Sequence, residues 1–388
     1  MNEIHVETFA SDARLAQAGV EYWSQDEEGA FRFKVAPIAA SLGIRVRDVA
    51  PRLAETSTAF VPEWPCRGCG GRRILANRED YVRGRSGPYE WLCTACVERR
   101  AAELAAARRA AIRTHFPAVR SVVFSELSLM DRVYLMSLAR LGKGGPGAPS
   151  GPVARAYPPL SPTPFQDRLI VERLRAQRLI QVDPDSDLDA FDWDEDGRPE
   201  IFDPLHVSWI IPARPKEPET PLVASRHEHE LASALQLCRS VLLQECFQYL
   251  EFAVAEHPRL SFYPGRETRE LFETLLVDLS VGQIYRLIWS SAKNAVAYAE
   301  KQGLAPRHAG STIITRMRNR ADHLLSDGRP IEAYQRNWRV PRSRLHEVLF
   351  DVLFPVGAEA AFTTRWSDLK ERIATMILPP ADAIAPRW

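Results

Sequence analysis

Two Cys-x-x-Cys pairs constrain this chain more than any other feature. Cys66 and Cys69 lie in the stretch WPCRGCGG, and Cys93 and Cys96 lie in EWLCTACVERR. Six cysteines in 388 residues do not form a secreted disulfide framework, so in a reducing compartment the paired four are better explained as metal ligands. Four thiolates suit tetrahedral zinc, and a closed shell leaves no coordination position for water or substrate. The sequence predicts one structural Zn²⁺ per chain; the alternative is a pair of redox dithiols.

The pattern around these cysteines resembles a treble-clef zinc finger. The first pair lies in a glycine-rich knuckle, and the second pair begins an alanine-rich helix without internal Gly or Pro. We expect the residues between the pairs to form a hairpin that turns near GRSGP. The resemblance covers residues 66–96 only, and it implies zinc and a small fold rather than a family for the whole chain.

Proline and glycine divide the chain into predicted modules. The stretches 142–164 and 212–221 are rich in Gly or Pro, which disfavours regular structure there. We predict a mainly α, multidomain protein with small α+β modules before a helical bundle. The predicted modules are a helix-turn-helix-like domain, a four-cysteine zinc finger with a long helix, a winged-helix-like domain and a helical bundle, at residues 1–62, 63–120, 121–212 and 222–388.

The first module combines a predicted hairpin with a helix-turn-helix pattern. VEYWSQ and AFRFKV carry aromatic and β-branched residues around the turn DEEG, which predicts two strands. The stretch APIAASLGIRVRDVAPRLAET then resembles a helix-turn-helix, with Gly43 at the turn because a positive φ is needed there. Pro51 departs from the pattern, since it falls inside the second helix. Arg45 and Arg47 are the candidate DNA contacts; plain helical packing is the alternative.

Arginines gather around the zinc-finger module. Residues 66–120 hold twelve arginines against five acidic residues. We predict phosphate contacts from five arginines of the expected hairpin, against the alternative of a solvated basic face: Arg72, Arg73, Arg78, Arg83 and Arg85. A second basic stretch, residues 307–344, interleaves arginines with Tyr334 and Trp338. Arg316 and Arg320 are its candidate nucleic-acid contacts, and the alternative is a bundle surface with the aromatics in the core.

The third module carries a strongly acidic hairpin. Residues 183–203 contain ten carboxylates and a single basic residue, Arg198. Phosphates would repel such a wing, so we expect it to face a protein partner. The partner-binding candidates are four residues near its tip: Asp192, Asp194, Glu195 and Asp196. The spacing in DWDEDGRPEIFD also matches an EF-hand loop, but Pro199 takes the usual apolar position, so a solvated acidic hairpin is preferred over a Ca²⁺ site.

The C-terminal third predicts an antiparallel helical bundle. One long apolar helix contains Cys238 and Cys246 as buried free thiols. Ser280 and Gln283 have capping-box spacing, and Gly303 supplies a C-cap. The HEHE stretch at residues 227–230 has no third ligand at helical spacing and predicts a surface helix start.

Composition excludes several classes of protein. Basic and acidic residues balance at 50 each, so a nucleic-acid partner has to be argued from local charge. The chain has no signal-peptide pattern and no apolar run of membrane-spanning length, which predicts a cytoplasmic protein without a membrane partner. The strong preference for arginine over lysine is typical of high-GC bacterial genes. No P-loop, GxSxG, HExxH, kinase or Rossmann motif is found; a protein that is not an enzyme is preferred, but missing motifs do not exclude activity, because many nucleases carry only dispersed acidic residues.

These features together predict a bacterial, nucleic-acid-associated zinc protein, DNA being the expected partner. A regulator, or an accessory subunit of a mobile-element or phage-defence system, would have this layout. In the first alternative the protein is an interaction scaffold with purely structural zinc. In the second it is an enzyme with an unrecognised site. Protein binding through the acidic hairpin or the helical domain is expected, and homo-oligomerisation is left open.

Overall fold

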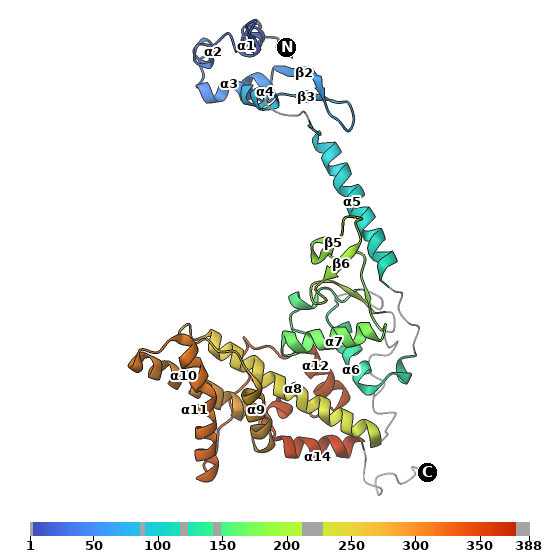
Figure 1. The fold of residues 1–388 in the computed structure, drawn as a ribbon, viewed down its shortest axis with the longest axis vertical. Helices are drawn as coiled ribbons and strands as arrows, with labels where there is room; N and C mark the ends of the chain where they lie inside the picture. The colour runs from blue at the N-terminus through green and yellow to red at the C-terminus, as the bar shows by residue number, and fades with distance from the viewer. Residues whose placement is uncertain (1–2, 86–89, 117–122, 143–148, 212–227, 378–388) are drawn as a thin grey trace. The chain divides into compact units, whose positions relative to one another are not determined.

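The structure divides into two compact units. The computed structural model (Figure 1) describes residues 3–85, 90–116, 123–142, 149–211 and 228–377. The units are Met1–Ala107 and Arg108–Trp388, and each is described by itself. Both contain helices and small antiparallel sheets, and the chain is mainly helical as predicted. Among the described residues, no helix is both long and apolar enough to cross a membrane.

The first unit combines short helices with a small antiparallel sheet. Its strands lie in the order β1-β2-β3, and Phe60 of β2 is paired with His5 on one side and Ile74 on the other. In chain order the elements are β1 His5–Thr8, α1 Ala13–Trp23, α2 Val35–Leu42, a 3₁₀ turn Val46–Asp48, α3 Val49–Ala54, β2 Ser57–Pro65, β3 Arg72–Ile74, α4 Arg78–Arg85 and α5 Thr94–His115. The last helix continues into the second unit.

Aromatic packing holds α4 against the sheet of the first unit. Trp64 near the end of β2 is buried and stacks on Tyr81 of α4, with ring centroids 5.4 Å apart. A side chain at Gly84 would place its Cβ 2.6 Å from the Trp64 ring, so this contact requires glycine. Burying each large aromatic side chain contributes about 1.5–3 kcal/mol, which makes this stack a main support of the unit.

The hairpin predicted between residues 20 and 35 is wrong. VEYW belongs to α1, whose N-cap Asp12 accepts a hydrogen bond from the Arg14 N–H at 2.8 Å. Its buried residues recur at helical spacing, and we missed this spacing because the aromatic and β-branched residues also fit a strand: Ala18, Gly19, Tyr22 and Trp23. The turn itself forms, since Gly29 has φ +79° and an isolated bridge joins Gln25 to Phe31.

The hairpin predicted between the two cysteine pairs is also wrong in its first strand, and its predicted turn near GRSGP lies largely outside the described residues. Residues 78–85 form α4 instead, with the acidic Glu79 and Asp80 in its first turn, where they favour a helix N-terminus. Asn77 accepts a hydrogen bond from the Asp80 N–H at 3.0 Å, which is a capping interaction. The strand pair of this region is β2–β3, and its turn is the cysteine knuckle of residues 66–71.

The second unit contains the remaining elements. Its N-terminal half contains the 3₁₀ turn Phe124–Glu126, α6 Leu129–Ala139, the 3₁₀ turn Val153–Arg155, α7 Pro164–Ala176, β4 Gln181–Val182, the 3₁₀ turn Leu188–Ala190, β5 Phe191–Trp193, β6 Pro199–Phe202 and β7 Trp209–Ile210. Its C-terminal half is helical and contains α8 Glu228–Ala255, α9 Arg266–Asp278, α10 Val281–Gln302, α11 Pro306–Ser326, α12 Arg344–Glu347, a π-helical turn Val348–Leu353, α13 Ala358–Thr363 and α14 Trp366–Ile377. The strands form two separate pairs, β4 with β7 and β5 with β6.

One hydrophobic core joins the predicted modules 121–212 and 222–388. Residues of α6 and α7 cluster with those of α8, α10 and α12. Polar contacts cross the same boundary: Thr163 Oγ1 donates to Gln244 Oε1 at 2.7 Å, and the Leu345 N–H donates to the Leu160 carbonyl at 2.9 Å. The two modules therefore pack as one unit. The tether predicted at residues 212–221 lies outside the described residues.

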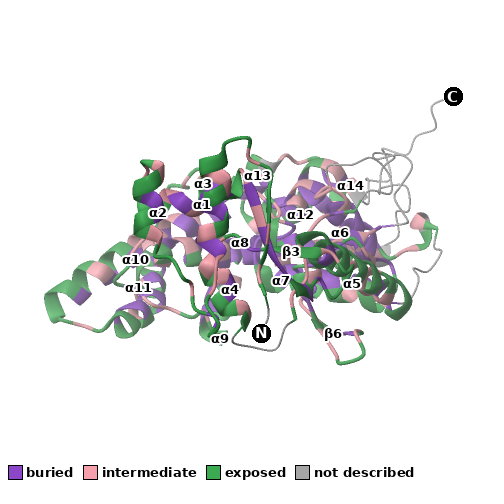
Figure 2. Ribbon diagram, turned by 90° about the horizontal axis from the view of Figure 1, so that it is seen from above, coloured by how far each residue is buried: buried purple, intermediate pink, exposed green. Residues whose placement is uncertain are grey.

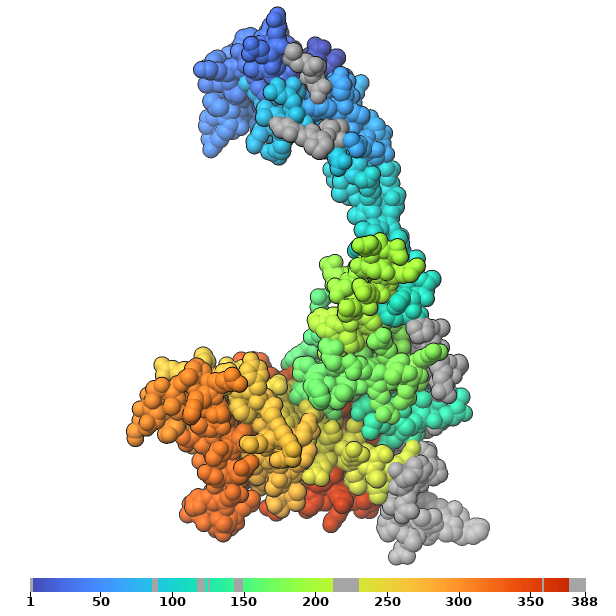
Figure 3. All heavy atoms as spheres, viewed as in Figure 1, coloured from blue at the N-terminus to red at the C-terminus, as the bar shows by residue number. Residues whose placement is uncertain are grey.

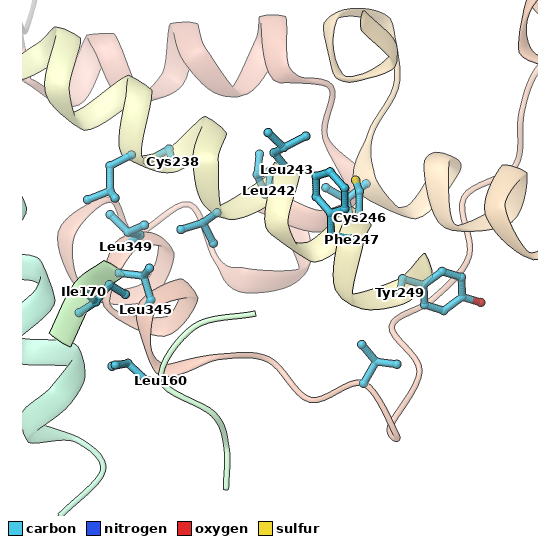
Figure 4. Packing of buried hydrophobic residues seen from close by; sticks show 14 of the residues in the cluster. Leu160, Ile170, Cys238, Leu242, Leu243, Cys246, Phe247, Tyr249, Leu345 and Leu349 are labelled. Atoms are coloured by element: carbon cyan, nitrogen blue, oxygen red, sulfur yellow. The ribbon is translucent and has the colours of Figure 1, made fainter. Parts of the chain in front are cut away.

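The long helix α8 runs through this core. Figure 2 shows it largely buried, and Figure 4 shows Cys238, Leu242 and Cys246 among the packed apolar side chains. Both cysteines are free and fully buried, which confirms the prediction. Burial raises the pKa of the Cys238 thiol, so this residue behaves as a small apolar side chain.

The helix caps predicted in the C-terminal third of the chain are formed. Ser280 and Gln283 form the capping box at the start of α10, and Gly303 ends that helix with φ +63°. On α11, Ile313 and Met317 are buried, whereas Leu325 is 43% exposed. The hairpin of α10 and α11 forms an orange lobe of the second unit in Figure 3.

Candidate metal centre

The four paired cysteines meet at one point of the first unit. One ligand atom from each lies within 4.8 Å of all the others, and Cys69 Sγ is 3.7 Å from Cys93 Sγ. Cys66 and Cys96 are buried, whereas Cys69 is exposed. Cys66 directly follows β2, and Cys96 lies in the first turn of α5, as the sequence predicts.

Glycine lets the knuckle close on the second cysteine pair. The Cys66 N–H donates to the Gly71 carbonyl at 2.7 Å, and the Gly70 N–H donates back to the Cys66 carbonyl at 2.8 Å. Gly70 has φ +71°, which favours glycine. A Cβ at Gly68 would lie 2.7 Å from Cys96 Sγ, so any larger residue would push the sulfurs apart.

Hydrogen-bond donors surround the sulfur atoms. The N–H groups of Cys93 and Gly68 point at Cys66 Sγ, at 3.2 and 3.4 Å. Burial opposes ionisation of this thiol, but these backbone donors outweigh it and lower the Cys66 pKa to about 6. Arg99 places Nη2 3.4 Å from Cys96 Sγ, adding a positive charge beside a second sulfur. The donors around Cys66 stabilise its thiolate, the form that ligates metal, whereas burial and the neighbouring cysteines raise the pKa of Cys96 to about 12.

The geometry fits a tetrahedral metal ion such as zinc. A zinc ion bonded to four thiolates at about 2.3 Å holds its sulfurs about 3.8 Å apart. The distance of 3.7 Å between Cys69 Sγ and Cys93 Sγ matches that spacing, and all four sulfurs lie within 4.8 Å of one another. Four sulfur ligands would fill the coordination shell, so the ion would link β2, the knuckle and α5 and would not bind substrate.

Comparisons with known proteins identify no family for this chain. No protein-family model matches the chain, and no curated protein or solved structure resembles it significantly. The metal centre therefore has to be interpreted from its own geometry.

Internal contacts engage three of the arginines predicted to bind phosphate. Arg78 donates to the carbonyls of Tyr22 and Phe33, at 2.6 and 2.7 Å, and burial lowers its pKa. Arg72 pairs with Glu7 at 2.6 Å and lies over the Phe60 ring. Arg73 lies over the Trp64 and Trp91 rings. Their positive charges are partly used to hold the unit together.

The remaining predicted arginines of the first unit are more exposed. Arg83 pairs with Glu79 at 3.1 Å along α4, and Arg85 Nη1 lies 3.4 Å from the Gly29 carbonyl. Arg45 and Arg47 flank the start of the 3₁₀ turn at 46–48, and both side chains are about 70% exposed beside Asp48 (69% and 72%). Among the described residues, the contacts of Arg83, Arg85, Arg45 and Arg47 are with these groups and not with the four cysteines.

The second basic stretch is largely neutralised by ion pairs. Arg336 pairs with Glu245, Arg339 with Glu256, and Arg342 with Asp351. Sequence reasoning missed these pairs because the partners lie up to 91 residues apart. On α11, Arg316 is half-buried and stacks over Tyr298 at 4.5 Å, and Arg320 is exposed. Trp338 is 82% exposed, whereas Tyr334 is half-buried.

The acidic hairpin forms as predicted, between β5 and β6. Asp194 accepts a hydrogen bond from the Arg198 N–H at 2.7 Å across the turn, and Glu195 and Asp196 are exposed. Asp203 turns away from the loop to Arg168 and His206. Within the part of the chain that the structure describes, the four cysteines form the only group able to hold a metal ion, which leaves the EF-hand spacing without support.

A buried carboxyl outside the metal centre should make the stability of the second unit depend on pH. Asp167 of α7 is 6% exposed and accepts a hydrogen bond from the Ser161 N–H at 2.7 Å. Burial raises its pKa from 3.8 to about 7, outweighing the Ser161 donors. Between about pH 4 and pH 7 the folded chain therefore holds a proton that the unfolded chain releases, so this carboxyl costs stability as pH rises.

Asp167→Asn should consequently stabilise the second unit more at pH 8 than at pH 5. The measurement is the urea unfolding midpoint, followed by far-UV circular dichroism, of the variant and the parent at both pH values. Asp189→Asn, at an exposed carboxyl, is the matched control and should shift neither midpoint. An Asp167→Asn effect of equal size at the two pH values would contradict the assignment.

Proposed function

We propose that the protein is a nucleic-acid-associated zinc protein whose first unit contacts DNA. One observation carries the proposal: α2 ends at Gly43 in the left-handed conformation, and a second helical segment, 46–54, follows it with exposed arginines. A helix, a tight glycine turn and a second helix form the arrangement that places a recognition helix in the major groove.

The packing of these helices supports a helix-turn-helix. Val49 and Leu53 are buried on the inner side of the second segment, against Ile38 and Ala39 of α2. Pro51 is the third residue of α3, and the first four N–H groups of a helix have no intrahelical acceptor. The proline that departs from the sequence pattern is therefore tolerated where it lies.

The outer side of the same segment is basic. Arg45, Arg47 and Arg52 are 69%, 72% and 51% exposed, and their acidic partners are Asp48 and Glu55, at most three residues away. Exposed ion pairs of this kind contribute about 0–1 kcal/mol, so DNA phosphates can replace the carboxylates at little cost. Arg52 was not among the predicted contacts; we include it in the proposal because it is exposed and lies on the same helical segment.

The metal has a structural part in this proposal. A zinc ion held by Cys66, Cys69, Cys93 and Cys96 would link the end of β2 to the start of α5. It would fix the sheet against which α3 packs, because β2 follows α3 directly and contacts it. A bacterial regulator, or an accessory subunit of a mobile-element or defence system, is the role in which we place such a protein.

The test is salt-dependent DNA binding. We expect the full-length chain to bind duplex DNA with an affinity that falls steeply between 50 and about 200 mM salt, since each phosphate contact releases counterions. The triple variant Arg45→Ala, Arg47→Ala, Arg52→Ala should lose about tenfold or more in affinity, and its salt slope should fall by about 1 per lost contact. Fluorescence anisotropy of a labelled duplex measures both quantities.

Two controls make this result specific. Arg266→Ala removes a 90% exposed arginine from α9 of the second unit and should leave the affinity unchanged. The pair Glu195→Gln and Asp196→Asn, at the acidic hairpin, should also bind DNA as the parent does. Equal binding by the triple variant and Arg266→Ala, or no salt-dependent binding by the parent, would rule out DNA contact by this segment.

The second part of the proposal is that the acidic hairpin binds a protein partner. Ile201 on β6 is 62% exposed, and the tip beside it presents Glu195 and Asp196 to solvent. An exposed apolar side chain rimmed by carboxylates suits a basic, partly apolar peptide. In the alternative function, an interaction scaffold without DNA, this hairpin would be the main binding surface.

A further inference from the structure

A pocket of about 560 Å³ lies among three helices of the second unit. Its lining comes from α8, α9 and α14. All three helices pack on one another, so the walls are fixed by the core and not by loops. Figure 1 shows α9 and α14 beside α8.

The walls of this pocket carry an excess of positive charge. Arg239, Arg269 and Lys370 face a single carboxylate among the described lining residues, that of Glu273. Arg239 donates to the Glu273 backbone carbonyl at 3.2 Å, which leaves its charge uncompensated. Arg269 Nη1 lies 3.9 Å from Glu273 Oε1, too far for a hydrogen bond. On formal charges the pocket carries two positive charges more than negative ones.

The pocket also has an apolar and aromatic side. Trp366 opens α14 and is half-buried, and Leu243 from α8 is 5% exposed. Gln236 and Ser240 add neutral hydrogen-bonding groups on α8. A ligand that fills this space would combine an anionic group with a flat or apolar part, and a volume between about 300 and 1,000 Å³ is usual for small-molecule sites.

We propose that the pocket binds a nucleotide, through its phosphate at the arginines and Lys370 and its base against Trp366. A phosphate monoester carries about −1.5 to −2 charge near pH 7, which matches the excess charge of the walls. Guanidinium groups bind phosphate oxygens in a forked geometry, and bases stack on aromatic side chains. An acidic peptide would meet the charge but would leave Trp366 without a stacking partner.

The phosphate monoester can belong to a free nucleotide or to the 5′ end of a nucleic-acid strand. Both share the chemistry that the pocket recognises. The site does not involve the arginines of the first unit, so it stands whether or not the segment 46–54 contacts DNA.

Isothermal titration calorimetry on the full-length chain tests the proposal. The probes are the four 5′-mononucleotides, the matching nucleosides, a glutamate-rich peptide, and one oligonucleotide with a 5′-phosphate or a 5′-hydroxyl. At least one mononucleotide should bind, and its nucleoside should bind tenfold or more weakly. A tighter complex with the 5′-phosphorylated strand than with the 5′-hydroxyl strand identifies the strand end as a ligand; equal binding of the two strands identifies the free nucleotide.

Variants separate this pocket from other basic surfaces. The double variant Arg269→Ala, Lys370→Ala should weaken mononucleotide binding tenfold or more. With inorganic phosphate as an additional probe, Trp366→Leu should lower the affinity for the mononucleotide more than the affinity for phosphate. Arg266→Ala, one turn away on α9, should bind as the parent does. If far-UV circular dichroism shows that the double variant is misfolded, Lys370→Ala alone, at an exposed side chain, provides the same comparison.

Three results would overturn the proposal. One is the absence of mononucleotide binding by the parent chain. Another is equal affinity of the pocket variant and Arg266→Ala, which would place the ligand elsewhere. The third is binding of the glutamate-rich peptide without binding of any mononucleotide, which would identify an acidic segment as the occupant.

Discussion

Replacing Cys96 by serine should abolish metal binding and unfold the region around the knuckle of the first unit. The parent chain should contain about one zinc ion, because its four sulfurs already lie within 4.8 Å of one another. Structural zinc contributes about 10–16 kcal/mol of apparent binding free energy in small zinc-finger peptides, more than a small unit can lose. Cys96 is buried and lies in the first turn of α5, so its loss affects both the site and the helix start.

Metal content and local protection together measure this effect. Zinc per chain is determined by mass spectrometry after purification, and hydrogen exchange follows the amides of β2 and β3. Chelation of the parent should expose the same amides as the substitution does. Cys238→Ala is the matched control, since it removes a buried cysteine of the second unit and should leave zinc content unchanged. Equal zinc content in the Cys96→Ser variant and the parent would contradict the assignment.

Local patterns explain what the sequence could predict. The cysteine pairs could be recognised because three-residue spacing and a following helix bring ligands together without long-range information. The capping box at Ser280 and the C-cap at Gly303 were equally local, and both formed as expected. The mainly helical fold class could be predicted for the same reason, because long apolar stretches predict helices whatever their tertiary surroundings.

Errors arose where two local interpretations compete or where partners are distant. VEYW fits a strand and a helix, and the Asp12 cap decided in favour of α1. The role of an arginine depends on tertiary contacts that no spacing reveals. Arg78 contacts carbonyls more than 40 residues away in sequence, and Arg336 pairs with a glutamate 91 residues away. The pocket beside Trp366 was not predicted for the same reason, since it forms only where α8, α9 and α14 meet.

A buried ion cluster in the second unit should contribute strongly to the stability of that unit. Glu245 of α8 is 1% exposed and lies 3.0 Å from Arg336 Nη1 and 2.9 Å from His346 Nδ1. Burial opposes its ionisation, but the two basic partners outweigh it and lower the Glu245 pKa from 4.5 to about 2. Ionisation of Glu245 therefore contributes to stability above about pH 4.5, and that contribution is lost as pH falls towards about 2.

Glu245→Gln should destabilise the second unit by about 3–5 kcal/mol at neutral pH, because it removes the carboxylate that pairs directly with the buried Arg336. At about 1–3 kcal/mol per molar urea, the unfolding midpoint should fall by about 1 M or more. Adding Arg336→Met should recover part of the loss, since it removes the unpaired charge. Glu270→Gln, which breaks an exposed pair with Arg266, should cost about 1 kcal/mol or less. Similar midpoints for Glu245→Gln and Glu270→Gln would show that the cluster does not stabilise the unit.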